Sequence, residues 1–172
     1  MIIKQGDITK AKVDCIINPT NGLGVMHKGV SNALSRAGGP EVENSAKEAC
    51  FYHGLYKPGE AYWGDSGQMK NYGIKAICHA VIIHRHPEKI KRQNVWEAVE
   101  SSLRLIRDAG YKSFAIPALG NEPREITARE CAKQTIILLA PCTNQFNIHI
   151  IDKNKEFIDA CIEYDAELRG EW

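Results

Sequence analysis

The chain has 172 residues, a length that suits one domain with one sizeable core, and we expect a single domain over residues 1–172. Hydrophobic residues make up 44% of it and charged residues 25%, as is usual for a soluble globular protein. The 22 Lys and Arg nearly balance the 21 Asp and Glu, and the resulting net charge of +1 argues against a protein built to bind nucleic acid or anionic membranes.

The six cysteines are scattered through apolar segments and form no CxxC pair, which argues against a disulfide scaffold or a zinc ribbon. The N-terminal segment MIIKQGDITK reaches a turn too early for a signal peptide, and no apolar stretch approaches the roughly 18 residues of a membrane span. We therefore expect a cytoplasmic protein outside the membrane with reduced, buried cysteines. They are Cys15, Cys50, Cys78, Cys131, Cys142 and Cys161.

In chain order, short runs rich in β-branched residues alternate with longer segments of helical period. The pattern predicts strands at 2–4, 13–18, 60–65, 76–80, 113–116 and 147–151, and helices at 30–37, 41–51, 95–108, 127–139 and 156–168. The fourth helix carries its own start signal, because Thr127 and Glu130 have the spacing of a capping box.

The sequences CIIN, AICHAV and FAIP are apolar on successive residues, which indicates strands covered on both faces by helices. A strand followed by a helix recurs four times, which favours parallel pairing. The predicted fold class is α/β, a three-layer α/β/α sandwich with a mixed, mostly parallel central sheet. Sheets of this kind bind ligands in a crevice beyond the carboxyl ends of their strands.

The predicted strand 13–18 leads into a turn that contains Gly22, Gly24 and Gly29 before a helix begins. A glycine-rich turn between a strand and a helix lets main-chain N–H groups approach phosphate oxygens. Glycines also fill turns simply to allow positive φ, and their spacing here differs from the GxGxxG dinucleotide fingerprint. A phosphate-binding loop and an ordinary connection therefore both stay open on this pattern alone.

Polar side chains accompany this turn. Asn18 and Asn21 carry amides that both donate and accept hydrogen bonds, which suits ribose hydroxyl groups or the pinning of a strained turn. Asp14, inside the predicted strand, has a carboxylate able to accept a hydrogen bond from an exocyclic amine such as that of adenine. These residue types suit a nucleotide-like ligand, and the two asparagines suit an ordinary turn equally well.

Several motifs, in order and at similar spacing, resemble the macro domain family over almost the whole chain. They are GDIT at 6–9, VDCIINPTN at 13–21, GV at 29–30, RAGGP at 36–40, GIKAICHAV at 73–81 and FAIPALG at 114–120. The resemblance implies binding of ADP-ribose and, as in many members, hydrolytic removal of ADP-ribose from proteins or nucleic acids or processing of ADP-ribose 1″-phosphate. It implies no cofactor and no metal ion, a monomer, and nucleic acid only as a modified substrate.

By position, the resemblance implies that Asp14 selects adenine and that Asp7 and Ile8 form a turn beside it. It implies that Asn18 braces the first loop and that Asn21 contacts the distal ribose and takes part in catalysis. The other ligand-binding residues it implies are Gly24, Lys28, Gly29 and Val30 in the first loop, and Ala118, Leu119, Gly120, Asn121 and Glu122 in the second.

The first loop departs from the family pattern. His27 and Lys28 stand where a glycine pair is usual, and Lys28 can offer a cation to phosphate. Ser31 stands where hydrolytic members often carry aspartate. The family's proposed chemistry is attack by a water held between the ligand's own phosphate and the loops. Beside Asn21, His27 is the candidate catalytic residue, since an imidazole exchanges protons near neutral pH, although an exposed surface histidine is the simpler interpretation.

Later segments also depart from the family. The second loop reads ALGNEPREIT and keeps only Gly120 of a glycine-rich type, and Glu122 would repel a diphosphate if it pointed inward. Asp152 stands where many members stack an aromatic ring on adenine, with Phe157 as a substitute one helical turn away. The altered second loop favours the rival hypothesis, a non-catalytic reader of ADP-ribose or a binder of a different nucleotide-like signal.

A metal-dependent enzyme is a third hypothesis, because His79, His84 and His86 lie near Cys78 in the sequence. A zinc site needs three or four converging ligands, and adjacent residues of a strand point to opposite faces. We therefore expect Cys78 and His79 to be core residues and the other two histidines to be exposed.

Overall fold

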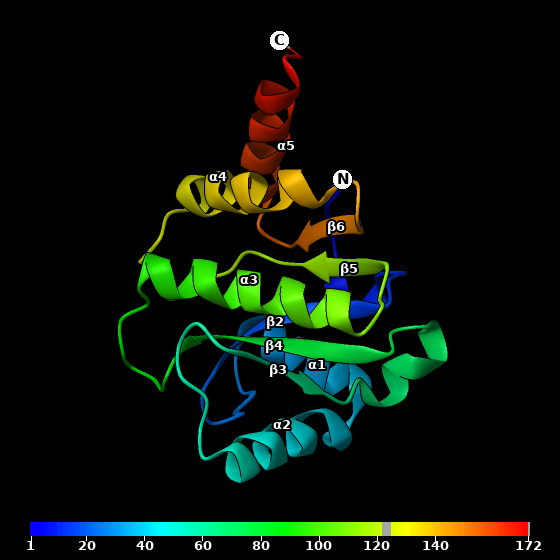
Figure 1. Ribbon diagram of the computed structural model, residues 1–172, viewed down its shortest axis with the longest axis vertical. Helices are drawn as coiled ribbons and strands as arrows, with labels where there is room; N and C mark the ends of the chain where they lie inside the picture. Colours follow the sequence, from blue (N-terminus) through cyan, green and yellow to red (C-terminus); the bar gives the residue numbers. More distant parts are fainter. Residues whose placement is uncertain (122–124, 172) are drawn as a thin grey trace.

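The computed structural model describes residues 1–121 and 125–171. At its centre is a six-stranded sheet in the order β1-β6-β5-β2-β4-β3. Neighbouring strands are parallel except for β3, which runs antiparallel to β4 at one edge (Figure 1). The strands are β1 (Ile2–Gln5), β2 (Cys15–Asn21), β3 (Ala61–Gly64), β4 (Ala76–Ile83), β5 (Ser113–Ile116) and β6 (Asn147–Asp152).

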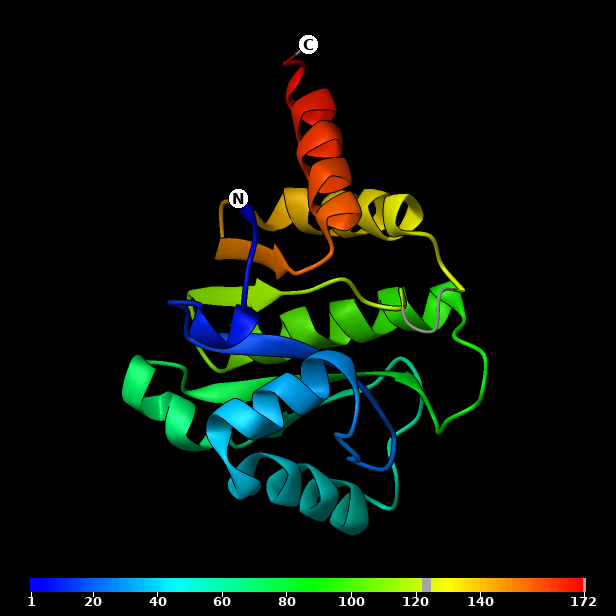
Figure 2. The same cartoon turned by 180° about the vertical axis from the view of Figure 1, so that it is seen from behind.

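Helices cover both faces of the sheet, with α3 in front of it in Figure 1 and α1 in front of it in Figure 2. The helices α1 and α2 bury Leu34 and Val42 in a core with Ile16 of β2, whereas α3, α4 and α5 share a second core with Phe114 of β5. The predicted three-layer architecture is confirmed. The helices are α1 (Gly29–Gly38), α2 (Pro40–His53), α3 (Arg92–Asp108), α4 (Ala128–Leu139) and α5 (Lys155–Arg169).

Each predicted strand and helix is present, with ends that shift by a few residues. The capping box at the start of α4 is formed, since the Thr127 side chain accepts from the main-chain N–H of Glu130 and the Glu130 side chain accepts from that of Thr127. Periodicity did not predict the short 3-10 helices at Ile8–Lys10, Gly67–Tyr72 and Ala140–Cys142, because one or two turns carry too few residues for a pattern.

The central strands β2 and β5 separate toward their carboxyl ends. β2 pairs with β4 as far as Asn21 but with β5 only at Cys15 and Ile16. Pro19, which has no N–H to give to a ladder, lies in this one-sided part of β2. Since the strand order also reverses direction here, this is the point where an open α/β sheet has its ligand crevice.

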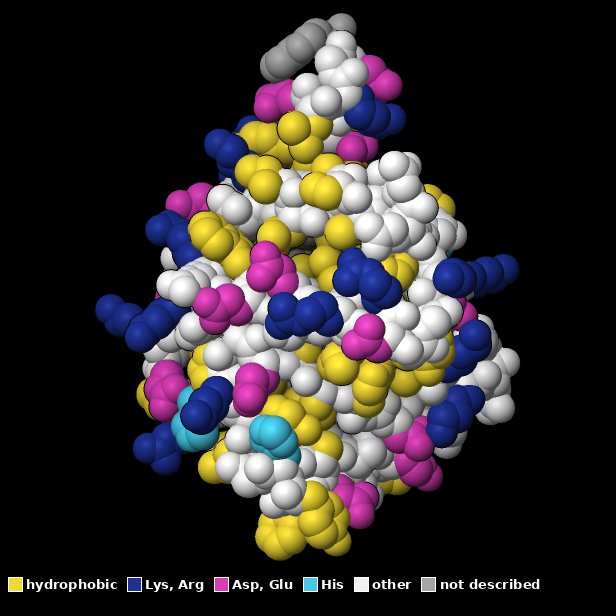
Figure 3. Space-filling view, viewed as in Figure 1, with side chains coloured by type: hydrophobic (Ala, Val, Ile, Leu, Met, Phe, Trp, Pro, Cys, Tyr) yellow, Lys and Arg dark blue, Asp and Glu magenta, His cyan; other side chains and the backbone are white. Residues whose placement is uncertain are grey.

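The surface shows no dominant charge on the face that carries α3, where Lys and Arg side chains are interspersed with Asp and Glu (Figure 3). That distribution agrees with the near-neutral net charge. Within the described ranges, none of the helices combines the length and the apolar character needed to cross a membrane.

Candidate functional site

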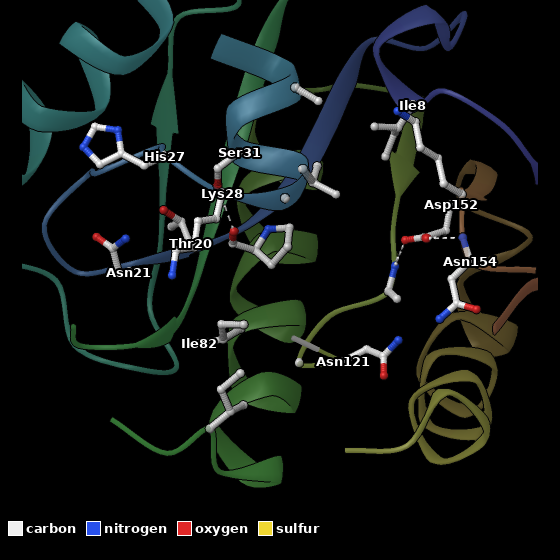
Figure 4. A pocket seen from close by; sticks show the side chains of 18 of the residues that line it. Ile8, Thr20, Asn21, His27, Lys28, Ser31, Ile82, Asn121, Asp152 and Asn154 are labelled. Carbon is white, nitrogen blue, oxygen red and sulfur yellow. Dashed lines mark hydrogen bonds between the residues drawn. The ribbon is translucent and has the colours of Figure 1, made fainter. Parts of the chain in front are cut away.

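A cleft of about 940 Å³ opens at the carboxyl ends of the strands. Its walls come from the turn after β1, the loop between β2 and α1, the end of β4, the loop after β5 and the end of β6 (Figure 4). Tertiary structure thus brings together segments that are far apart in the sequence. The predicted site residues that line it are Asp7, Ile8, Asn21, His27, Lys28, Gly29, Val30, Ala118, Gly120 and Asn121.

One end of the cleft carries the carboxylate of Asp7. Its Oδ1 accepts hydrogen bonds from the main-chain N–H of Thr9 at 3.0 Å and from the Thr9 hydroxyl at 2.7 Å. Burial alone would raise the pKa of the Asp7 carboxyl, but these bonds, together with the nearby Lys153 and Lys10, lower it. Asp7 is therefore ionised at neutral pH and can accept a hydrogen bond from an amine or hydroxyl group.

The middle of the cleft is the N-terminus of α1. No side chain caps this helix, and the main-chain N–H groups of Gly29, Val30 and Ser31 have no acceptor among the described residues. Gly29 has a φ of 54°, which glycine adopts without strain. Free N–H groups at the positive end of a helix dipole bind anions, and the neighbouring Lys28 adds a full positive charge.

Asn21 and His27 lie at the other end, away from Asp152 and Asn154 (Figure 4). The Asn21 amide is largely engaged in its own turn. Its Oδ1 accepts from the N–H groups of Leu23 at 3.0 Å and Val25 at 3.3 Å, and its Nδ2 donates to the carbonyl oxygen of Val25 at 2.9 Å. An amide held in this way shapes the loop and keeps one N–H for a ligand, but it does not act as an acid or base.

Glu43 of α2 holds the loop that carries His27. Its Oε1 accepts a hydrogen bond from the main-chain N–H of Met26 at 3.0 Å, and it lies 3.1 Å from Nζ of Lys47 and 3.8 Å from Nδ1 of His27. The His27 side chain is 69% exposed and also lines the cleft, so water can reach the imidazole. This geometry suits a general base.

Asp152 fixes the opposite wall. Its Oδ2 accepts from the main-chain N–H of Ala118 at 3.0 Å and its Oδ1 from that of Asn154 at 2.8 Å (Figure 4). The Asp152 carboxylate, at the position where the resemblance implies an aromatic ring, thus ties the second loop to β6. Phe157 is fully buried in the core and cannot stack on a ligand, so that suggestion was wrong. The predicted Glu122 lies outside the described residues.

Asp14 lies just before β2, at the amino-terminal ends of the strands, whereas the cleft lies at their carboxyl ends. Its Oδ2 accepts from the main-chain N–H groups of Lys112 at 2.8 Å and Ser113 at 3.1 Å, and its Oδ1 lies 2.8 Å from Nζ of Lys75. Burial alone would raise the pKa of the Asp14 carboxyl, but these bonds lower it. The predicted role in adenine selection is wrong, because the whole length of β2 separates this carboxylate from the ligand crevice.

Three further predicted ligand contacts do not line the cleft. Gly24 has a φ of 74°, and a Cβ there would lie 2.6 Å from the main chain of Ala46, so it allows the loop to pack on α2. Leu119 is 2% exposed and its carbonyl oxygen accepts from the Cys131 thiol, which places it in the core behind the second loop. Asn18 is fully buried beneath the first loop, where its Oδ1 accepts a hydrogen bond from a side chain of α1.

Sequence reasoning missed Ile82, Ile83, His86 and Ile90, which line the cleft at and after the end of β4. The rule that ligands sit beyond the carboxyl ends of parallel strands would have found them, had the strand been predicted to its true end at Ile83. Among the described lining residues there is no Phe, Tyr or Trp.

Cys78 and His79 belong to different cores, as expected for adjacent strand residues. Cys78 packs on the side of α3, whereas His79 stacks on Tyr62. Over residues 1–121 and 125–171, no three His, Cys, Asp or Glu side chains are placed to hold a metal ion together.

Comparisons with known proteins point to one family. A family model described as Macro domain matches residues 17–135. An O-acetyl-ADP-ribose deacetylase of Enterobacter cloacae subsp. cloacae is 37% identical over 120 residues, which are 67% of this chain and 63% of that protein. Among solved structures, the macrodomain of Mycobacterium tuberculosis DarG has a TM-score of 0.77 at 22% identity, over 89% of this chain and 97% of that one. An Oceanobacillus iheyensis macrodomain with ADP has a TM-score of 0.81 at 20% identity, over 97% and 90%.

Proposed function

Because this chain belongs to the macro domain family, we propose that its cleft binds ADP-ribose and that the protein hydrolyses a bond at the distal ribose. The observation that carries the proposal is the uncapped start of α1. Three N–H groups there have no acceptor among the described residues, and they lie in the middle of a cleft of about 940 Å³, which is large enough for a nucleotide sugar. A diphosphate in the middle would direct the two halves of the ligand to the two ends.

The adenine belongs at the end formed by Asp7 and Ile8. Asp7 is ionised, lines the cleft and keeps one carboxylate oxygen free of partners among the described residues, so in this proposal it takes the adenine-selecting role that the resemblance implied for Asp14. Ile8 offers an apolar surface for the purine. The diphosphate then lies on the N–H groups of Gly29, Val30 and Ser31, with Lys28 beside it.

The distal ribose belongs at the end formed by Asn21 and His27. There Asn21 donates its remaining Nδ2 hydrogen to a ribose oxygen, and His27 takes a proton from the attacking water. In an ester substrate the water oxygen bonds to the carbonyl carbon, the bond to the ribose oxygen breaks, and that oxygen takes up a proton. The similarity to a protein named O-acetyl-ADP-ribose deacetylase supports such an ester as one substrate.

A non-catalytic reader of ADP-ribose is the second candidate. The internal bonding of Asn21 favours it, since the loop is already satisfied without a reacting group. Both candidates require the same binding mode. They differ only in whether a bond is cleaved after binding.

Binding is tested by calorimetry with ADP-ribose and AMP on the unmodified protein and on Asp7→Ala and Asp14→Ala. We expect Asp7→Ala to weaken both ligands about tenfold or more, the effect of losing a hydrogen bond to a charged group. Asp14→Ala is the matched control, because this carboxylate precedes β2 at the amino-terminal ends of the strands, away from the cleft, and it should leave affinity unchanged. No binding of ADP-ribose by the unmodified protein would refute the proposal.

Turnover is tested separately with O-acetyl-ADP-ribose, ADP-ribose 1″-phosphate and mono-ADP-ribosylated protein and DNA. Release of ADP-ribose from any of them supports the hydrolase. Tight binding of ADP-ribose without turnover of any of the substrates would establish the reader instead.

A further inference from the structure

Beneath the anion-binding start of α1 lies a chain of buried polar groups that begins at His79. The His79 Nδ1 is 3.1 Å from the Asn18 Nδ2, and the Asn18 Oδ1 accepts a hydrogen bond of 3.1 Å from the Ser31 hydroxyl. The same hydroxyl lies 3.2 Å from the carbonyl oxygen of Pro19. His79 and Asn18 are fully buried, and Ser31 is 8% exposed. The chain thus connects β4 and β2 to the first turn of α1.

The orientation of the Asn18 amide, whose Oδ1 accepts from Ser31, assigns the proton of His79. An amide nitrogen only donates, so the Nδ1 of His79 must accept from Asn18, and the proton of a neutral imidazole then sits on Nε2. Nε2 has no partner among the described residues. Burial lowers the pKa of His79 to about 3, so the ring is neutral at neutral pH.

Stacked rings hold the imidazole in the orientation that this bond needs. The ring centroid of His79 lies 4.8 Å from that of Tyr62, with an interplanar angle of 20°. The stack continues from Tyr62 to Tyr56, with centroids 4.3 Å apart and an angle of 13°. It ends at the surface with His53, whose centroid lies 3.9 Å from that of Tyr56 at an angle of 3°. On the far side of the imidazole, Gly64 leaves room for the ring, because a Cβ there would lie 2.4 Å from Nε2. A ring confined in this way aims Nδ1 at Asn18.

We propose that His79 is a positioning residue for the diphosphate site: as the Nε2–H tautomer it orients Asn18, and through Asn18 and Ser31 it holds the N–H groups at the start of α1 in place for phosphate. The inference rests on the proposed function for its ligand. It also accounts for Ser31 at a position where the resemblance implies aspartate in hydrolytic members, since the single Ser31 proton is shared between the Asn18 and Pro19 oxygens and a carboxylate would have no proton to give.

The first test needs no variant. In ¹⁵N-labelled unmodified protein, long-range proton–nitrogen NMR spectra report which imidazole nitrogen carries the proton. We expect the neutral Nε2–H form of His79 with no change between pH 5 and pH 8. A proton on Nδ1, or a cationic ring in this range, would overturn the proposal, because Asn18 would then have to be turned the other way.

The second test separates positioning from general stability with His79→Leu and His79→Asn. Leucine fills the core but removes the acceptor, whereas asparagine keeps an acceptor near the place of Nδ1 and packs less well. We expect His79→Leu to bind ADP-ribose about tenfold more weakly and adenosine, which has no phosphate, as before. His79→Asn should regain most of the affinity for ADP-ribose even where it is the less stable variant.

The control is Cys78→Ala, the neighbouring residue of β4 that packs in the other core. It should lower stability and leave both affinities unchanged. Affinity that simply follows stability across the variants, or an equal loss for adenosine and ADP-ribose, would show His79 to be only a core residue. Absence of ADP-ribose binding by the unmodified protein would instead refute the proposed function. The NMR spectra would still show which nitrogen of His79 carries the proton.

Discussion

Asp152 Oδ2 lies 3.0 Å from the main-chain nitrogen of Ala118, so the end of β6 holds the first residue of the second loop against the cleft. The same carboxylate accepts from the N–H of Asn154 and so also shapes the turn into α5. One side chain thereby sets the distance between two walls of the site.

Asp152→Ala removes the acceptor of both N–H groups. We expect the free energy of unfolding to fall by about 1–3 kcal/mol, because two partly buried donors lose their partner, and the affinity for ADP-ribose to fall several-fold as the second loop loosens. Thermal unfolding and calorimetry measure the two effects. Asp152→Asn keeps one acceptor oxygen and should retain more of both, and equal damage by the two variants would contradict this account.

Gly29→Ala should weaken ADP-ribose binding, because an alanine at a φ of 54° costs about 1–2 kcal/mol and relaxes by moving the N–H groups that hold phosphate. Gly54→Ala is the matched control. Gly54 has a φ of 82°, no atom within 4 Å of its added Cβ, and a place at the end of α2 outside the cleft. Calorimetry and thermal unfolding of both variants should show similar losses of stability and a loss of affinity only in Gly29→Ala.

His27→Ala should lower kcat about 100-fold or more and change KM little, since a general base acts in the transition state and the ligand is held by other groups. Stability should change by less than about 0.5 kcal/mol, because the side chain is 69% exposed. Steady-state kinetics on the best substrate measures this. His86 also lines the cleft, and a larger loss of kcat in His86→Ala would move the role of base to that residue.

Burial of His79 predicts a pH dependence of stability. Its pKa falls from 6.5 to about 3 on folding, so below pH 6.5 the unfolded chain binds a proton that the folded chain does not. The stabilisation that comes from this pKa difference is complete above pH 6.5 and is lost as the pH falls. The free energy of unfolding should decrease by roughly 2 kcal/mol between pH 7 and pH 5. Denaturant unfolding of the unmodified protein should show this loss and His79→Leu should lack it. Parallel curves for the two proteins would mean that His79 is not the group responsible.

The strands and helices follow from local signals in the sequence. Apolar runs such as Ile77 to Val81 and the capping box at Thr127 depend only on neighbouring residues, which explains why the strands and helices appear where the patterns predict them. The glycine-rich turn between β2 and α1 is likewise a local feature, and a strand, a turn and a helix start are the elements that the proposed phosphate site requires.

Which side chains meet in the cleft was decided by the tertiary structure. Asp7 and Asp14 are close in the sequence, and either carboxylate could accept a hydrogen bond from adenine. β2 begins just after Asp14, however, and leads the chain to the carboxyl ends of the strands, so Asp14 is left at the opposite ends, away from the cleft. In the same way, nothing local joins Asp152 to Ala118 or His79 to Asn18, since each contact depends on strand order and register. Sequence by itself determined the elements, the family and the glycine-rich turn before α1, because these depend on local patterns and motifs. Which carboxylate lines the cleft, and which buried side chains support that turn, depend on the long-range pairing of strands.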